Sequence, residues 1–131
     1  MHEVNDPAPA LDLPTDGGGR VSLAALKGKP VVVYFYPKDD TTGCTREAQD
    51  FTALAPDFAA LGVPVIGVSK DTVKKHDRFK AKYDLAVTLA SDEDGAACEA
   101  WGVWMQKKLY GREYMGIERA TFLIDAEGRV A

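Results

Sequence analysis

The stretch that decides the fold spans residues 31–47 and reads VVVYFYPKDDTTGCTRE. It begins with an unbroken run of β-branched and aromatic residues, which is typical of a strand buried on both faces in a parallel sheet. Pro37 fixes the chain direction where that strand ends. Turn-forming residues and then a helical pattern follow, so Cys44 is predicted to lie where a strand passes into a helix.

This position gives Cys44 a chemical interest beyond that of an ordinary buried thiol. The first N–H groups of a helix lack intrahelical acceptors and lie at the positive end of its dipole, so they favour a thiolate and can hold a polar substrate. Thr41 and Glu47 lie three residues before and after Cys44, on the same side of the first turn. The Thr41 hydroxyl is therefore expected near the sulfur, and Glu47 is placed to orient a cation. No C-x-x-C pair is present, which argues against a dithiol motif.

The rest of the chain alternates predicted strands with predicted helices. The strands are predicted at residues 7–13, 20–26, 31–36, 63–68, 85–89 and 120–124. The helices are predicted at residues 44–61, with a break at Pro56, at 71–83 after a cap within 69–71, and around 97–101, while 102–116 is irregular or hairpin-like. This order indicates an α/β fold with a mixed central sheet flanked by helices and an N-terminal hairpin.

Size and charge limit the classes of protein that need considering. The chain has 131 residues, enough for one ordinary domain, and its formal net charge of -4 gives no reason to expect a nucleic-acid partner. No apolar run has the length of a membrane span, and the polar N-terminus lacks the regions of a signal peptide, so a cytoplasmic location is predicted. The two cysteines lie far apart and do not suggest a disulfide scaffold.

Several motifs together resemble those of a known family. Residues 37–44, with Glu47 following, are similar to the P-x-x-x-T-x-x-C active-site motif of peroxiredoxins, and residues 34–51 resemble the branch called bacterioferritin comigratory protein or peroxiredoxin Q. The resemblance continues in SDED, WGVW and GIERATFLID, which begin at Ser91, Trp101 and Gly116. It implies a thioredoxin-like fold and an antioxidant oxidoreductase that reduces hydrogen peroxide and organic hydroperoxides without a metal or organic cofactor.

The resemblance also implies roles for individual residues on the substrate side. Cys44 would attack the peroxide as a thiolate and become a sulfenic acid. Thr41 and the backbone N–H groups of Gly43 and Cys44 would hold the peroxide oxygens, and Pro37 would shield the sulfur from water. Thr41 is also expected to cap the helix.

A cation is implied as well. Arg119 opens a predicted strand in the last of the motifs, and in the family pattern it would approach Cys44, stabilise the thiolate and stabilise the leaving alkoxide. Glu47 would orient Arg119. From spacing alone, Glu47 could equally be a solvated acid in the first turn of the helix.

The second cysteine leaves the reductive half of the cycle open. Many members of the branch carry a resolving cysteine five residues after the peroxidatic one, where this chain has Gln49, and others carry it in the helix at 71–83, which has none. Cys98 lies in a pattern typical of a buried helix position, and we favour a structural role for it. Thioredoxin, glutaredoxin or a small thiol would then resolve the sulfenic acid. The alternative is a disulfide between Cys44 and Cys98 after local unfolding.

Other residues receive simpler interpretations. His2 and His76 show no ligand spacing and are predicted to be surface residues. Asp39 and Asp40 fit a turn better than a metal pair. Family members usually continue beyond residues 129–131 with more of that strand and a covering helix, so we expect either truncation or a partner covering the sheet.

A function of a different class also stays open. A thioredoxin-like binding module with a redox-sensing cysteine would share the fold without fast peroxide turnover. Members of the branch are often monomeric, which predicts a monomer here.

Overall fold

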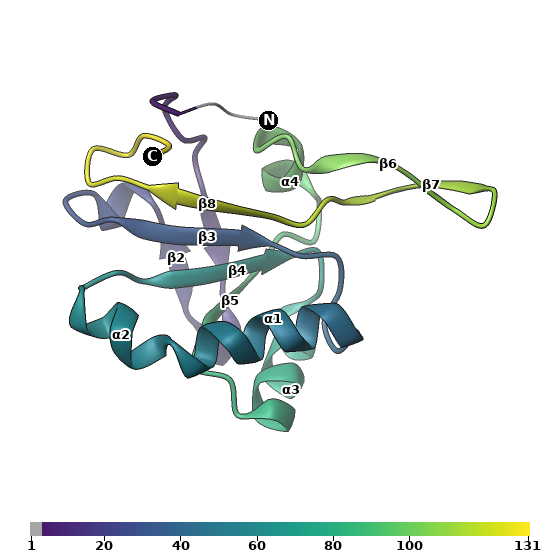
Figure 1. The fold of residues 1–131 in the computed structure, drawn as a ribbon, viewed down its shortest axis with the longest axis horizontal. Helices are drawn as coiled ribbons and strands as arrows, with labels where there is room; N and C mark the ends of the chain where they lie inside the picture. The colour runs from purple at the N-terminus through teal and green to yellow at the C-terminus, as the bar shows by residue number, and fades with distance from the viewer. Residues whose placement is uncertain (1–3) are drawn as a thin grey trace.

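The computed structural model describes residues 4–131, with Leu109 through its backbone alone (Figure 1). A four-stranded sheet of order β5-β4-β3-β8 forms its centre. The strands are β3 (Val31–Phe35), β4 (Val65–Ser69), β5 (Thr88–Ser91) and β8 (Ala120–Ile124). β3, β4 and β5 run parallel, whereas β8 is antiparallel to β3, so the predicted mixed sheet is confirmed.

β3 divides the interior into two cores, one on each face of the sheet. All five of its residues are buried, as its apolar run predicts. Because side chains alternate along a strand, Val33 and Phe35 pack in one core with Trp101, while Tyr34 and its second neighbour Tyr36 pack in the other. The sheet therefore lies between two groups of side chains that do not mix.

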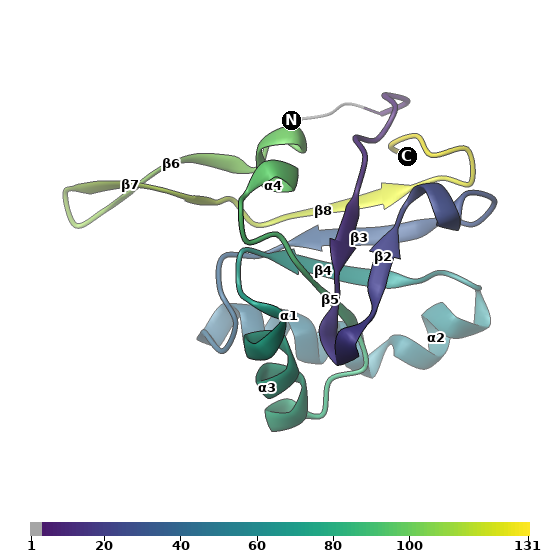
Figure 2. The same cartoon turned by 180° about the vertical axis from the view of Figure 1, so that it is seen from behind.

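Helices and a hairpin cover the two faces. The helices are α1 (Thr42–Ala53), α2 (Ala55–Ala60), α3 (Val73–Tyr83) and α4 (Ala96–Ala100). α1 and α2 cross one face of the sheet in Figure 1, and the N-terminal hairpin crosses the other face in Figure 2. Pro56 lies in the first turn of α2, so the predicted break is confirmed.

Two hairpins complete the fold. The N-terminal one pairs β1 (Asp12–Pro14) with β2 (Arg20–Ser22) around a 3-10 turn, η1 (Asp16–Gly18), and a second turn, η2 (Ala24–Leu26), replaces the end of the predicted strand. The other pairs β6 (Trp104–Leu109) with β7 (Arg112–Ile117) and projects from the body in Figure 1. Tyr110 and Gly111 between its strands both have positive φ, as a tight hairpin turn requires.

Several element boundaries differ from the prediction, and the first strand, expected at residues 7–13, is β1 at Asp12–Pro14. The strand expected at 85–89 is β5, three residues later, because Leu85 and Val87 bury their side chains in the Tyr34 core from a connecting segment. α3 is capped by Thr72, whose hydroxyl accepts a hydrogen bond from the Lys75 N–H at 3.1 Å, and the cap expected within 69–71 is wrong. No helix within residues 4–131 has the length and apolar composition that crossing a membrane requires.

Gly67 on β4 makes room for the Tyr34 ring on β3. A Cβ atom at Gly67 would lie 2.6 Å from Cζ and 2.7 Å from the hydroxyl oxygen of Tyr34, and the ring is held on its other side by stacking on Phe51 at 4.6 Å. We expect Gly67→Ala to lower the free energy of unfolding by about 1–3 kcal/mol, because the ring has no free space to enter. Urea denaturation followed by circular dichroism measures this.

Tyr34→Phe is the matched control. The Tyr34 hydroxyl is buried and has no hydrogen-bond partner among the described residues, so its removal should leave stability unchanged or slightly raised. Tyr34→Phe combined with Gly67→Ala should recover part of the loss. An unchanged urea midpoint for Gly67→Ala would contradict this account of the β3–β4 packing.

Candidate active site

Cys44 lies in the first turn of α1, directly above β3. It is 2% exposed and packs with Tyr34, Tyr36 and Ala48. The first helical hydrogen bond runs from the Thr45 N–H to the Thr41 carbonyl at 2.8 Å. The N–H groups before Thr45 belong to the first turn, where a helix has no acceptors of its own to offer. The sulfur therefore lies beside N–H groups that can receive a negatively charged or polar atom.

Arg119 immediately precedes β8, and its side chain reaches Cys44. Its Nη2 atom donates to the Cys44 sulfur at 3.2 Å, and its Nη1 atom donates to Glu47 Oε1 at 2.5 Å. β8 runs antiparallel to β3, so its first residue, Ala120, pairs with Phe35 at the end of β3. This pairing brings together two residues that lie 75 positions apart in the chain.

Gly43 permits the close approach of the guanidinium. A Cβ atom at this position would lie 3.2 Å from Arg119 Nη2, closer than side-chain carbons normally come to another atom. The glycine next to the cysteine thus has a steric reason, which the motif alone did not supply. A side chain at this position would require the guanidinium to shift by a few tenths of an ångström.

Burial and charge shift the acid–base behaviour of the groups around the sulfur. Burial raises the pKa of Glu47, and the charge and hydrogen bond of Arg119 oppose that shift only in part. Burial by itself would lower the pKa of Arg119, but the hydrogen bond and charge of Cys44, together with Glu47, outweigh it and raise the pKa. Burial, followed by the charges of Glu47, Asp39 and Cys44, raises the pKa of Tyr34 so that its hydroxyl stays neutral.

Thr41 and Pro37 lie at the surface of the loop between β3 and α1. The Thr41 hydroxyl donates to the Lys38 carbonyl at 3.0 Å and makes no capping hydrogen bond to α1. Thr41 is the N-cap residue of α1, as predicted, but its side chain does not cap the helix, because the hydroxyl closes the preceding turn instead. Pro37 is exposed and follows β3 after one residue, Tyr36.

Two open depressions flank the first turns of α1. The first is lined by Gly43, Arg46, Glu47, Asp50, Phe51, Leu54 and Arg119. The second is lined by Asp40, Thr41, Thr42, Thr45, Arg46, Gln49, Asp50 and Tyr83. The first depression combines a cation with apolar side chains and borders the guanidinium that contacts the sulfur. It is the more suitable of the two for a small substrate with an apolar portion.

Cys98 belongs to the opposite core. It is fully buried in α4, where the Asp92 carboxylate accepts hydrogen bonds from the N–H groups of Ala97 and Cys98 at 3.1 and 2.8 Å. Burial, then the hydrogen bond and charge of Asp92, raises the pKa of the Cys98 thiol. The core around Cys98 contains Val33 and Phe35, whereas Cys44 packs with Tyr34 and Tyr36, so the sheet separates the two sulfurs.

His76 is the residue that the sequence interpretation placed wrongly. It was predicted to be a surface residue, but it is fully buried and lies 2.7 Å from a carboxylate oxygen of Asp39. Helix periodicity could have predicted the burial of His76. It precedes the buried Phe79 by three residues and the half-buried Tyr83 by seven, which is the spacing of one helix face. His2 lies outside the described residues.

Asp39 and Asp40 occupy the turn after β3, and each has its own partners. Asp39 is buried against Tyr36 and His76, whereas Asp40 is exposed and paired with Lys82 at 2.8 Å. Within residues 4–131, no cluster of three or more His, Cys, Asp or Glu side chains is arranged to hold a metal ion.

Comparison with known proteins defines the class. The AhpC/TSA family matches residues 4–131, so the chain belongs to that family. Peroxiredoxin Bcp of Bacillus subtilis is 51% identical over 128 residues, which cover 98% of this chain and 82% of the relative.

Solved structures narrow the class to one branch. The bacterioferritin comigratory protein of Xanthomonas campestris superposes with a TM-score of 0.86 at 48% identity, covering 92% of this chain and 77% of the other. A peroxiredoxin Q mutant from Xylella fastidiosa superposes with a TM-score of 0.92 at 36% identity, covering 99% and 83%. The chain is a peroxiredoxin of the Bcp/peroxiredoxin Q branch with a thioredoxin-like fold, as its motifs predicted.

The raised pKa of Glu47 predicts how this side chain affects stability at different pH values. An acid whose pKa is higher in the folded than in the unfolded state stabilises the fold below its unfolded pKa, and that contribution is lost as the pH rises through the folded pKa. Glu47→Gln should therefore leave the free energy of unfolding unchanged or raised near pH 7. Below about pH 4, where an ordinary Glu is protonated, the wild type should gain relative to the variant.

Urea denaturation of both proteins across this pH range measures the difference. Glu93→Gln, which changes an exposed glutamate outside α1, serves as the control. A Glu47→Gln variant that is destabilised near pH 7 and matches the wild type at acid pH would show that the ion pair with Arg119 outweighs the cost of burial.

Proposed function

We propose that this peroxiredoxin reduces hydrogen peroxide and organic hydroperoxides through a sulfenic acid on Cys44, which an external thiol resolves. The contact of Arg119 with the Cys44 sulfur carries the proposal. It pairs the nucleophile with a cation in a site where the sulfur is almost fully shielded from water. A cation in this place stabilises the thiolate before attack and the negative charge that develops on the departing oxygen.

The oxidative step breaks the O–O bond. The Cys44 thiolate attacks one peroxide oxygen, the bond electrons leave with the other oxygen as hydroxide or alkoxide, and this product takes up a proton to become water or alcohol. The sulfur is oxidised to a sulfenic acid. The Arg119 guanidinium and the N–H groups of Gly43 and Cys44 supply donors toward the oxygens on which charge develops.

Thr41 has a complementary role in this step. A hydroxyl has one donor and two acceptor lone pairs, and the Thr41 donor is already used on the Lys38 carbonyl. Its oxygen therefore keeps acceptor capacity for the O–H of a hydroperoxide, a group that a dialkyl peroxide lacks. Glu47 keeps the guanidinium in place by taking its second N–H group. Pro37 shields the approach from water.

The first depression suits the organic part of a hydroperoxide. Phe51 and Leu54 line it next to Arg119 and offer apolar surface within the same recess. The solved relative from Xanthomonas campestris is described for its alkyl peroxide reduction activity. We therefore include alkyl hydroperoxides among the substrates of this chain.

The reductive steps use thiols from outside the chain. Because the central sheet lies between Cys44 and Cys98, a disulfide between them would require both cores to open. A thiol of thioredoxin, glutaredoxin or a small molecule attacks the sulfenic sulfur instead and releases water. A second thiol then attacks the mixed disulfide, which frees Cys44 and leaves the two reductant thiols joined as a disulfide.

We predict that Cys44→Ser abolishes peroxide reduction and that Arg119→Ala lowers the second-order rate constant for Cys44 oxidation by about 100-fold or more, because the main charged donor at the leaving oxygen is lost. Stopped-flow measurement with hydrogen peroxide gives this constant. Arg112→Ala, which removes an exposed arginine from the projecting hairpin, is the control and should react like the wild type. Slow oxidation that does not respond to Arg119→Ala would support a redox-sensing module instead of a peroxidase.

The role of Cys98 is tested by intact mass after one equivalent of peroxide. We predict that the wild type gains one oxygen, and that Cys98→Ser keeps full turnover with dithiothreitol and with thioredoxin. A loss of two hydrogens in the wild type, absent in Cys98→Ser, would replace the external resolution with a two-cysteine cycle.

A further inference from the structure

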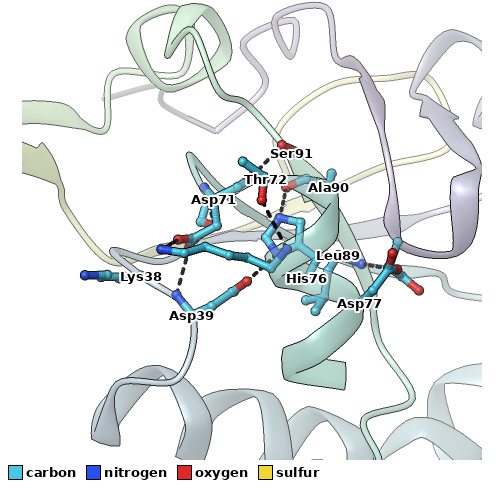
Figure 3. Close-up of polar contacts among 12 residues, drawn as sticks. Lys38, Asp39, Asp71, Thr72, His76, Asp77, Leu89, Ala90 and Ser91 are labelled. Atoms are coloured by element: carbon cyan, nitrogen blue, oxygen red, sulfur yellow. Dashed lines mark hydrogen bonds and ion pairs between the residues drawn. The ribbon is translucent and has the colours of Figure 1, made fainter. Parts of the chain in front are cut away.

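Asp39, in the loop between β3 and α1, is held by three side chains, and Figure 3 shows its contacts with Asp71 and His76. Its Oδ1 accepts from the Tyr36 hydroxyl at 2.5 Å, and its Oδ2 lies 2.7 Å from Nδ1 of His76 on α3. Its backbone N–H donates to the Asp71 carboxylate at 2.8 Å, just ahead of α3. None of these contacts includes Cys44, Arg119 or Glu47, so the reaction described above leaves the network unused.

His76 is held through both of its ring nitrogens. Its Nε2 atom lies 2.9 Å from the Ala90 carbonyl on β5, and its Nδ1 atom faces Asp39. Both ring nitrogens thus face oxygens that accept hydrogen bonds. A proton on Nδ1 lets the ring donate to the Asp39 carboxylate, and both partners are removed from water. Such a pair holds its geometry strongly, because neither partner can leave the other without remaining buried and unpaired.

This pair is the buried anchor of the loop that leads into Cys44. In the loop at residues 37–41, Asp39 is buried while the other residues are exposed. Asp40 also contacts α3, through Lys82 and the Tyr83 hydroxyl, but that ion pair is open to solvent and weakened by it. Asp39 lies two residues before Thr41, whose carbonyl accepts the first hydrogen bond of α1. A shift of Asp39 would therefore move the first turn of the helix.

We propose that Asp39 and His76 are positioning residues, which lock the loop at residues 37–41 to α3 and thereby keep the first turn of α1 in the geometry where Cys44 meets Arg119. The inference rests on the proposed peroxidase function. α3, which contributes no residue that touches the sulfur through a hydrogen bond, then acts on the reaction through the loop. His76, predicted from sequence to lie at the surface, is the centre of this connection.

The test compares two reactions of the same sulfur. Attack on hydrogen peroxide needs the full arrangement of donors around Cys44, whereas alkylation by iodoacetamide needs only a thiolate. A residue with a merely structural role changes the ratio only through the unfolded fraction, in which Cys44 is accessible to iodoacetamide but has lost its neighbouring donors. A positioning residue lowers the ratio of the peroxide rate constant to the alkylation rate constant in protein that is still fully folded.

Asp39→Ala and His76→Gln should lower this ratio by about 10- to 100-fold, the effect expected when reacting atoms are displaced by about 1 Å. They should also speed hydrogen exchange in residues 38–45. Tyr36→Phe removes one contact of Asp39 while keeping the ring in place, so it should lower the ratio by a few fold even if the stronger variants fail to fold.

Asp39→Asn is the conservative rescue. An asparagine accepts from Tyr36 and donates to a neutral His76, which still donates from Nε2 to Ala90, so the ratio should stay within about threefold of the wild type. Asp77→Ala is the control on the same helix, because the Asp77 carboxylate accepts from the Gly17 N–H and not from the loop. It should leave the ratio unchanged.

Unchanged ratios and unchanged exchange in folded Asp39→Ala and Tyr36→Phe would overturn the proposal, as would both rate constants falling in equal proportion. A wild type that does not react with peroxide would overturn the proposed function instead. Hydrogen exchange alone would then test whether Asp39 and His76 hold the loop at residues 37–41 against α3. Faster exchange in the variants would support this, and unchanged exchange would reject it.

Discussion

The hydrogen bond from Arg119 to the Cys44 sulfur is the interaction on which the rest of the site depends. It joins the helix that follows the first central strand to the residue that precedes the last one. The antiparallel pairing of β8 with β3 fixes where Arg119 emerges, and Gly43 leaves the space that its guanidinium occupies. Glu47 completes the arrangement from the next turn of α1. The order and direction of the strands thus determine that Arg119 and Cys44 come into contact.

The two cores place the two cysteines on opposite faces of the central sheet. Cys44 lies in the first turn of α1 on one face of the sheet, and Cys98 lies in α4 on the other face, where its N–H donates to Asp92. In the cycle we propose, oxidation falls to Cys44 and structural packing to Cys98. A protein or small-molecule thiol then reduces the sulfenic acid. The loop at residues 37–41 contacts α3 through Asp39 and His76, and in our further inference this contact keeps the first turn of α1 in place.

Much of this could be predicted from sequence because the signals were local. The buried run of β3 and the break at Pro56 follow from residue type and order, and both are confirmed. The motifs brought Cys44, Arg119 and Glu47 together, and the structure places them in contact, while their catalytic roles remain proposals.

The parts that sequence did not reveal depend on packing between distant segments. Leu85 and Val87 form an apolar run like a strand, but they fill the core beneath α1, and β5 begins only at Thr88. His76 has a surface-type side chain that is buried because Asp39 and the Ala90 carbonyl satisfy both of its ring nitrogens. Only helix periodicity hinted at its burial. The Thr41 hydroxyl had two acceptable local partners, and spacing could not choose between them.

The central claim is tested most directly by a double-mutant cycle on the free energy of unfolding, with Cys44→Ala, Arg119→Ala and the two combined. Residues in contact show coupling energies of about 0.5–3 kcal/mol, and the account predicts a coupling within that range that weakens as salt is added. Additive effects of the two substitutions at low salt would contradict it, because the guanidinium and the sulfur would then not be interacting in the folded protein.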